Sequence, residues 1–297
     1  MAARTEYVPS PDDGRVLEFR PADPAGARTL TPAQVAAFNR DGFLRPLPVF
    51  DRDETDRVRA YVDSLLAAVV DAPDERNAYS INAYHVVCQG LYDLMLTPRI
   101  LDYVEDLLGP DIVCWGDHLF CKLPGDPMEV PLHQDAVYWP LTPTRTVTAW
   151  IAIDDADEAN GAMQLVPGSH LLGPLEHEEK PLDGTRVLKR QVCDPGRFAD
   201  RVTNVLRAGE ISLHADLLVH GSHANRSDRR RAGLTLRYAA AEVGVVPGAE
   251  WWIKPAVHCR GTIPDTWPHW RRPDGEHPEK LAAMWGDFDG NPPPDAG

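Results

Sequence analysis

The hydrophobic pattern of the chain changes its period once, near residue 110. Before that point apolar residues recur at the three- and four-residue spacing of amphipathic helices, and after it apolar and polar residues alternate as in strands. The first part predicts three helices, over residues 32–41, about 53–70 and 98–108. Thr31-Pro32 and Thr97-Pro98 are typical helix starts, because threonine can cap a first turn and proline fits the first helical position.

The alternating part predicts a series of short strands separated by clusters of Asp, Gly and Pro. They lie at residues 111–123, 145–153, 162–167, 210–220 and 232–243. Helices followed by many short strands predict an α+β fold built on a β-sandwich or jelly roll. No linker divides the chain, so we expect one domain over 1–297. Its parts are a loose arm (1–30), a mainly helical segment (31–109), a jelly-roll core (110–245) and an irregular tail (246–297).

Composition narrows the function classes. The net charge of −15 argues against a nucleic-acid partner and against adhesion to an anionic membrane. No stretch has the roughly 20 apolar residues of a membrane helix, and the N-terminus lacks an apolar leader. Five cysteines without a C-x-x-C pair argue against a zinc ribbon and a disulfide scaffold. These features favour a cytoplasmic protein, and they leave its oligomeric state open.

The sharpest chemical signal is His133-Gln134-Asp135. On a strand, residues two apart point to the same face, so the imidazole and the carboxylate would enter one cavity together. A histidine from a facing strand would complete two histidines and one carboxylate on a metal, an arrangement that leaves open positions on Fe(II). The motif alone does not decide this, because His214-Ala215-Asp216 has the same form.

A third ligand is available at His220, which ends an apolar stretch and is followed by Arg229, Arg230 and Arg231. An arginine that enters a cavity can bind a carboxylate through two parallel N–H bonds. We expect one of the three arginines to do so and the other two to lie in a solvated turn.

Taken together, five segments resemble the phytanoyl-CoA dioxygenase family of Fe(II)/2-oxoglutarate-dependent oxygenases. They are K-L-P-G (122–125), H-Q-D (133–135), T-A-W-I-A-I-D (148–154), N-G-A-M-Q-L-V-P-G-S-H (160–170) and H-G-S-H-A-N-R-S-D-R-R-R (220–231). They follow the family's order and spacing over about residues 110–243. The resemblance implies a double-stranded β-helix, a cupin-like jelly roll with N-terminal helices packed on it.

The resemblance also implies roles. The iron ligands would be His133, Asp135 and His220. The co-substrate 2-oxoglutarate would be bound by Arg231, with Ser222, Trp150 and Lys122 at family positions near it. Halogenating relatives carry Gly or Ala at the position of Asp135, so a carboxylate there favours hydroxylation.

Other residues near these motifs invite a role in substrate binding. Tyr138 and Trp139 could wall the cavity or simply pack in the core, and Asp117 could bind a polar substrate or be a surface acid. If strict alternation holds from His214 to His220, then His214 and Asp216 share the face of His220. They would support the ligands from behind or compete with them.

The sequence therefore predicts a dioxygenase that uses Fe(II), 2-oxoglutarate and O2 to hydroxylate a small-molecule metabolite, with release of succinate and CO2. The alternative is a metal-dependent hydrolase or isomerase on a cupin-like barrel, because two histidines and a carboxylate also suit zinc.

Overall fold

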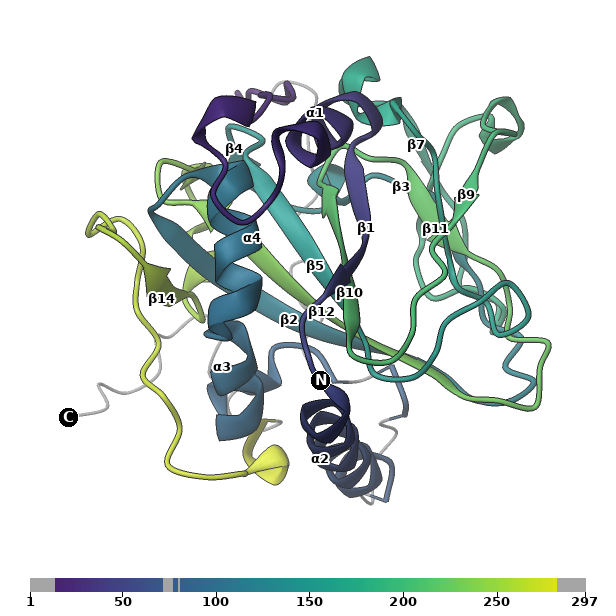
Figure 1. Ribbon diagram of the computed structural model, residues 1–297. Coiled ribbons are helices and arrows are strands. Elements are labelled where there is room, and N and C mark those ends of the chain that lie inside the picture. Colours follow the sequence, from purple (N-terminus) through teal and green to yellow (C-terminus); the bar gives the residue numbers. More distant parts are fainter. Residues whose placement is uncertain (1–13, 72–76, 80, 282–297) are drawn as a thin grey trace.

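The structure is a computed structural model that describes residues 14–71, 77–79 and 81–281 (Figure 1). The helices are α1 (Pro32–Asp41), α2 (Arg52–Val70), α3 (Gln89–Met95) and α4 (Pro98–Leu108). Short 3-10 turns are η1 (Pro24–Gly26), η2 (Tyr84–Val86), η3 (Asp135–Val137), η4 (Ser169–Leu172), η5 (Pro195–Arg197), η6 (Glu250–Ile253) and η7 (Pro278–Lys280).

Two antiparallel sheets form the centre of the fold. The larger contains β1 (Phe43–Pro48), β2 (Ile112–Lys122), β5 (Thr146–Ala152), β10 (Glu210–Ala215), β12 (Arg231–Ala240) and β14 (Val257–Arg260), in the order β1-β10-β5-β12-β2-β14. The smaller contains β3 (Val130–His133), β6 (Met163–Leu165), β9 (Val202–Thr203) and β11 (His220–Ser222), in the order β3-β11-β6-β9. Two further pairs are β4 (Leu141–Thr142) with β13 (Gly244–Val245), and β7 (His177–Glu179) with β8 (Arg190–Val192). This architecture confirms the predicted jelly roll.

The larger sheet is covered on one face by helices, among them α3 and α4 (Figure 1). Every residue of β5 is buried, and its two sets of side chains have different neighbours. Val147, Ala149 and Ile151 join the main hydrophobic core, whereas Thr148 and Trp150 face a cavity on the other side. The sheet thus separates a packed core from the chemical site.

The three predicted helices are confirmed. The predicted Thr31 cap is present at α1, whereas Thr97 precedes α4 without a side-chain capping hydrogen bond. At α1, the Thr31 side chain accepts a hydrogen bond from the Gln34 backbone, while Gln34 returns one to the Thr31 backbone. Gly42 ends the helix in the left-handed region at φ 84°, which favours glycine. Pro98 opens α4 and Gly109 follows its end.

Several segments differ from the prediction. α3 and β1 were not predicted, and the predicted strand over 210–220 is two strands, because the chain leaves the larger sheet after β10 and enters the smaller one as β11. The prediction of an irregular tail was wrong at β14, which pairs with β2. The arm is also not loose over its described part, since Arg15 donates to the carbonyls of Ala136 and Trp139, at 2.8 and 2.7 Å. The earlier arm residues lie outside the described part.

None of the helices in the described ranges has both the length and the apolarity that a membrane crossing requires.

Candidate active site

A cavity lies between the two sheets, with about 450 Å³ of empty space when its opening to solvent is included. Its ionisable lining residues are the histidines His133, His214 and His220, the carboxylate Asp135, and the arginines Arg231 and Arg237. The remaining wall is mostly apolar or aromatic, with Phe120, Val130, Trp150 and Met163 among its members. Such a cavity, with a few convergent polar groups on an apolar wall, has the usual composition of a small-molecule site.

His133, Asp135 and His220 meet at one point of this cavity. His133 ends β3, Asp135 opens η3, and His220 begins β11, where it is the register partner of His133. One ligand atom from each residue lies within 4.8 Å of the other two. The Asp135 Oδ1 atom is 3.4 Å from His133 Nε2 and 3.9 Å from His220 Nε2. The predicted ligand set is therefore brought together.

Backbone carbonyls fix the orientation of both ligand imidazoles. His133 Nδ1 lies 2.8 Å from the Pro131 carbonyl, and His220 Nδ1 lies 3.0 Å from the Leu218 carbonyl. A carbonyl can only accept, so each Nδ1 carries the proton and each Nε2 presents its lone pair to the cavity. Burial and the neighbouring histidines lower the pKa of His220 to about 3, which keeps that ring neutral.

Asp135 supplies the negative charge of the cluster. Burial alone would raise its pKa, but contacts with His133 and His214 outweigh burial and hold the pKa well below the usual range. Its second oxygen lies 3.5 Å from His214 Nε2 and accepts from the Thr148 hydroxyl at 3.3 Å. Two neutral imidazoles and an ionised carboxylate fit a divalent metal such as Fe(II) or zinc.

Arg231 forms a second centre of charge. It begins β12, is 1% exposed, and donates through Nη2 to the Gly161 carbonyl at 2.8 Å and to the Ser222 hydroxyl at 3.5 Å. Its Nε has no hydrogen-bond partner, and none of the described carboxylates forms an ion pair with it. Burial lowers its pKa to about 10, so it remains a cation at neutral pH. A buried unpaired guanidinium of this kind fits the carboxylate of a bound ligand.

Trp150 lies close to Arg231, and both residues line the cavity. The guanidinium carbon is 5.7 Å from the indole centroid, and the indole is 1% exposed. The ring crosses β12 at Gly233, where a Cβ atom would stand 1.8 Å from Trp150 Cζ2. Glycine at that position is what lets the indole lie against the strand.

Lys122 was expected near the co-substrate, but it does not line the cavity. It is fully buried opposite Arg231 on β2, and its ammonium donates to the carbonyls of Met128 and His223, the latter at 2.8 Å. Burial and the Arg231 charge lower the pKa of Lys122 to about 7. The sequence motif therefore located the residue correctly in the sheet but not the target of its ammonium.

The three candidate substrate residues also lie outside the lining. Tyr138 packs edge-on against His133, with ring centroids 5.7 Å apart, and Trp139 belongs to the main core. Asp117 is fully buried and faces the backbone and ring of His85, so the surface alternative for it was wrong. Side chains on both faces of a central sheet are buried, which sequence alternation alone does not reveal.

The second H-x-D motif divides between two environments. His214 lines the cavity and contacts Asp135, but neither of its ring nitrogens makes a hydrogen bond. Asp216 is outside the lining and accepts from the Thr146 hydroxyl at 2.7 Å. Strict alternation from His214 to His220 fails because the chain changes sheets between them.

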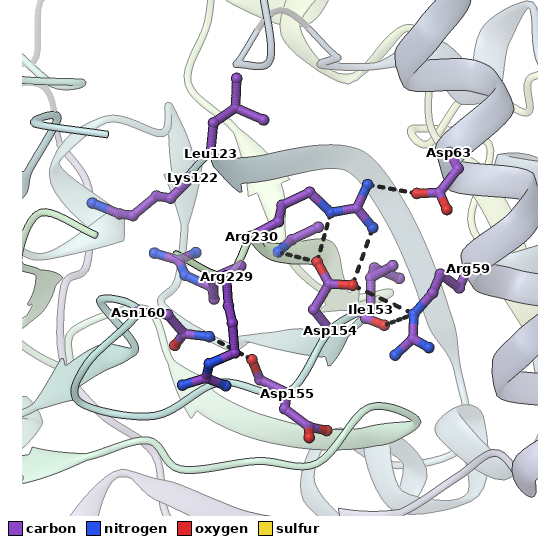
Figure 2. A network of polar contacts seen from close by, with 12 residues as sticks. Arg59, Asp63, Lys122, Leu123, Ile153, Asp154, Asp155, Asn160, Arg229 and Arg230 are labelled. Atoms are coloured by element: carbon purple, nitrogen blue, oxygen red, sulfur yellow. Dashed lines mark hydrogen bonds and ion pairs between the residues drawn. The ribbon is translucent and has the colours of Figure 1, made fainter. Parts of the chain in front are cut away.

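The two arginines before Arg231 have structural partners, and Figure 2 shows those of Arg230. Arg230 pairs with both oxygens of Asp154, at 2.7 and 3.0 Å, and with Asp63 of α2 at 2.6 Å. This pairing corrects the expectation of a solvated turn for Arg230. Arg229 fits that expectation, since it forms an exposed ion pair with Asp157.

Arg237 is the charged lining residue that sequence reasoning missed. It follows Arg231, Gly233 and Thr235 on one face of β12, at two-residue spacing. The two-residue spacing is visible in the sequence, but the sequence does not show which face of the strand lines the cavity.

These features define a jelly-roll protein with a cluster of two histidines and one carboxylate that could hold a metal ion, and with a buried arginine in the same cavity. The sequence profile "Phytanoyl-CoA dioxygenase (PhyH)" matches residues 38–233, more than half of the 297. The chain belongs to the phytanoyl-CoA dioxygenase family.

Individual relatives agree with this assignment. The chain is 32% identical over 157 residues to the peroxisomal phytanoyl-CoA dioxygenase of Bos taurus, covering 51% of this chain and 46% of that protein. It is 26% identical over 238 residues to the ectoine dioxygenase of Bordetella parapertussis, covering 73% and 77%. The chain spans about half the length of the phytanoyl-CoA dioxygenases it matches.

Solved structures show the same fold. The non-heme monooxygenase ThoJ in its apo form has a TM-score of 0.71 at 27% identity, covering 84% of this chain and 93% of that one. CytC3 with Fe(II) and alpha-ketoglutarate has a TM-score of 0.54 at 25% identity, covering 74% and 80%.

Proposed function

We propose that the protein is a non-haem Fe(II)- and 2-oxoglutarate-dependent dioxygenase that hydroxylates a small-molecule metabolite, with release of succinate and CO2. The observation that carries the proposal is one cavity that holds both the His133–Asp135–His220 cluster and the unpaired, buried Arg231. Relatives named as dioxygenases and a neighbour solved with Fe(II) and alpha-ketoglutarate support it. We further propose that residues 1–297 act as one domain in the cytoplasm.

The side chains divide the work in this proposal. His133, Asp135 and His220 would hold Fe(II) through two Nε2 atoms and a carboxylate oxygen. Arg231, with the Ser222 hydroxyl beside it, would hold the remote carboxylate of 2-oxoglutarate. Trp150 and Met163 would exclude water around the co-substrate. When bound, Fe(II) and 2-oxoglutarate supply the O2-dependent oxidation of a C–H bond.

The unpaired cation also separates this function from the hydrolase or isomerase alternative. A hydrolytic zinc site needs a metal-bound water and has no need for a second, anion-binding centre in the same cavity. Arg231 does require a bound anion, because its buried charge forms no ion pair with a carboxylate of the described residues.

The test is succinate release by the full-length protein, measured with and without Fe(II), 2-oxoglutarate and O2. A library of metabolites is then screened for compounds that stimulate the release. We expect a requirement for all three components and its loss in Asp135→Ala. Turnover of a library compound with zinc in the absence of O2 would instead establish the hydrolase or isomerase.

A further inference from the structure

Arg237 lies at the opposite end of the cavity-facing row of β12 from Arg231. From position 231 to position 237 an extended strand advances roughly 20 Å, so the two guanidinium groups serve different parts of the cavity. Arg237 is the register partner of Thr148, which in turn pairs with His214. Both of those residues contact Asp135. Arg237 therefore belongs to the row of the larger sheet that faces the metal cluster.

The Arg237 guanidinium is held by aromatic rings and not by acids. Its carbon lies 5.4 Å from the ring centroid of Trp115 and 5.6 Å from that of Trp139, and those two rings pack edge-on against each other at 4.7 Å. Within residues 14–71, 77–79 and 81–281 it makes no hydrogen bond and no ion pair, and its Nε is buried. Stacking of this kind fixes the plane of the fork while leaving its N–H groups free for a ligand.

The two acids near Arg237, Asp117 and Asp135, do not form an ion pair with it. Asp117 is the register partner of Leu236, so alternation places it on the other side of the sheet, where it faces His85. Asp135 is already engaged by His133, His214 and Thr148. A charged arginine in a cavity wall without a protein partner is stabilised by an anion that binds there.

The charges of the cavity indicate how many negative charges that anion carries. Its charged lining residues are one carboxylate, Asp135, and two arginines. Adding Fe(II) and the dianion 2-oxoglutarate leaves one positive charge uncompensated. A substrate with a single negative charge would complete the balance in this low-dielectric space.

We propose that Arg237 binds a carboxylate of the substrate, and that the protein acts on a small monocarboxylic acid. The planar carboxylate matches the guanidinium fork, which lies over the rings of Trp115 and Trp139. The acid would share this cavity with the co-substrate, so the proposal is restricted to small acids. This inference rests on the proposed function for the identity of the co-substrate, but the anion site itself can be tested separately.

The test is calorimetric binding to the full-length protein, loaded with Fe(II) and saturating 2-oxoglutarate under anaerobic conditions. The probes are propionate, hexanoate, benzoate and phenylacetate, each compared with its own primary amide. Saturating 2-oxoglutarate keeps the probes away from Arg231 and the metal. The variants are Arg237→Gln and, as a control for net charge, Arg40→Gln, whose side chain is 70% exposed on α1.

We expect at least one acid to bind the wild type and its amide to bind roughly 10-fold or more weakly. Arg237→Gln should remove this preference while its affinity for 2-oxoglutarate stays within about twofold of wild type, and Arg40→Gln should change neither. Absence of acid binding, equal binding of acid and amide, or a retained preference in Arg237→Gln would overturn the proposal. If Arg237→Gln loses 2-oxoglutarate binding instead, Arg237 is a co-substrate residue and the inference is wrong.

Failure of the dioxygenase proposal has a different signature. In that case the wild type does not bind 2-oxoglutarate or release succinate. The probes are then titrated against the metal-loaded protein alone, where a preference for acid over amide that depends on Arg237 still reports the anion site.

Discussion

His133 and His220 are register partners across β3 and β11, and each orients its ring by the same contact, from Nδ1 to the carbonyl two residues earlier. Two strands that are far apart in the sequence thus present two Nε2 lone pairs to one point. Because backbone atoms hold both rings, the metal-binding geometry depends on the pairing of these strands and exists before a metal arrives.

Removal of the carboxylate should abolish metal binding selectively. In Asp135→Ala only two imidazoles remain, and we expect Fe(II) affinity to fall by more than roughly 100-fold, together with succinate release. Asp216→Asn is the matched control from the second H-x-D motif, because Asp216 contacts Thr146 and lies outside the cavity lining. Calorimetric titration of Fe(II) under anaerobic conditions measures both. Equal loss in the two variants would contradict the assigned ligand set.

Substitutions of Arg230 and Arg231 should have different effects, one on the stability of the fold and the other on 2-oxoglutarate binding. Arg231→Gln removes the buried cation, so we expect 2-oxoglutarate binding to weaken by roughly 30-fold or more, about 2–5 kcal/mol. Arg230→Gln should leave that affinity nearly unchanged but destabilise the fold by about 1–3 kcal/mol, because it leaves Asp154 and Asp63 without their shared partner (Figure 2). Calorimetry and urea denaturation give the two quantities. The reverse pattern would place the anion site at Arg230.

Lys122 should make stability rise with pH above neutrality. Its folded-state pKa is about 7, whereas the ordinary value is 10.5. Below pH 7 the ammonium is charged in both states and its burial costs stability in full. Between pH 7 and 10.5 the unfolded chain still binds the proton that the folded chain has released, so the free energy of unfolding increases with pH.

The variant Lys122→Met should therefore show a smaller increase in the free energy of unfolding between pH 6.5 and 9 than the wild type. Urea denaturation at the two pH values measures it. Lys180→Met serves as the control, because Lys180 is partly exposed and pairs with Glu178 at 2.8 Å. Identical increases in Lys122→Met and the wild type would show that Lys122 is not responsible.

A single methyl group at Gly233 should disturb the co-substrate pocket. The Cβ of Gly233→Ala would overlap the Trp150 ring, so the indole must leave its present position beside Arg231. We expect a loss of about 1–3 kcal/mol in stability and weaker 2-oxoglutarate binding. Gly244→Ala is a suitable comparison, since its Cβ would stand 3.8 Å from the nearest atom, an ordinary contact. If Gly233→Ala bound 2-oxoglutarate as tightly as the wild type, the close contact between the Trp150 ring and Gly233 would not be important for the site.

Local signals were sufficient for the helices but not for the ligand set. Thr31 and Gly42 define the ends of α1 from neighbouring atoms alone. The ligand set depended on the family resemblance, because the H-x-D form occurs twice, and Asp135 lies in η3 and not on the strand that ends at His133. β1 was not predictable in this way. It contains Pro46 and Pro48, and it is a strand because it pairs with β10 at the sheet edge, a contact that no local pattern encodes.

Side-chain direction was the harder part of the site. Lys122 and Arg231 are register partners, yet only the arginine reaches the cavity, because carbonyls of a neighbouring loop take up the ammonium. Arg237 was overlooked for a related reason. Which face of β12 meets the cavity depends on how the smaller sheet packs over it, and that packing is set by contacts distant in the sequence.

The metal cluster and the anion-binding arginine belong to different layers of the molecule. His133 and His220 come from the smaller sheet, whereas Arg231 comes from the larger one. A 2-oxoglutarate molecule bound by both the metal and Arg231 would connect the smaller sheet to the larger one. Loading with metal and co-substrate together should therefore stabilise the packing of the two sheets more than loading with metal alone.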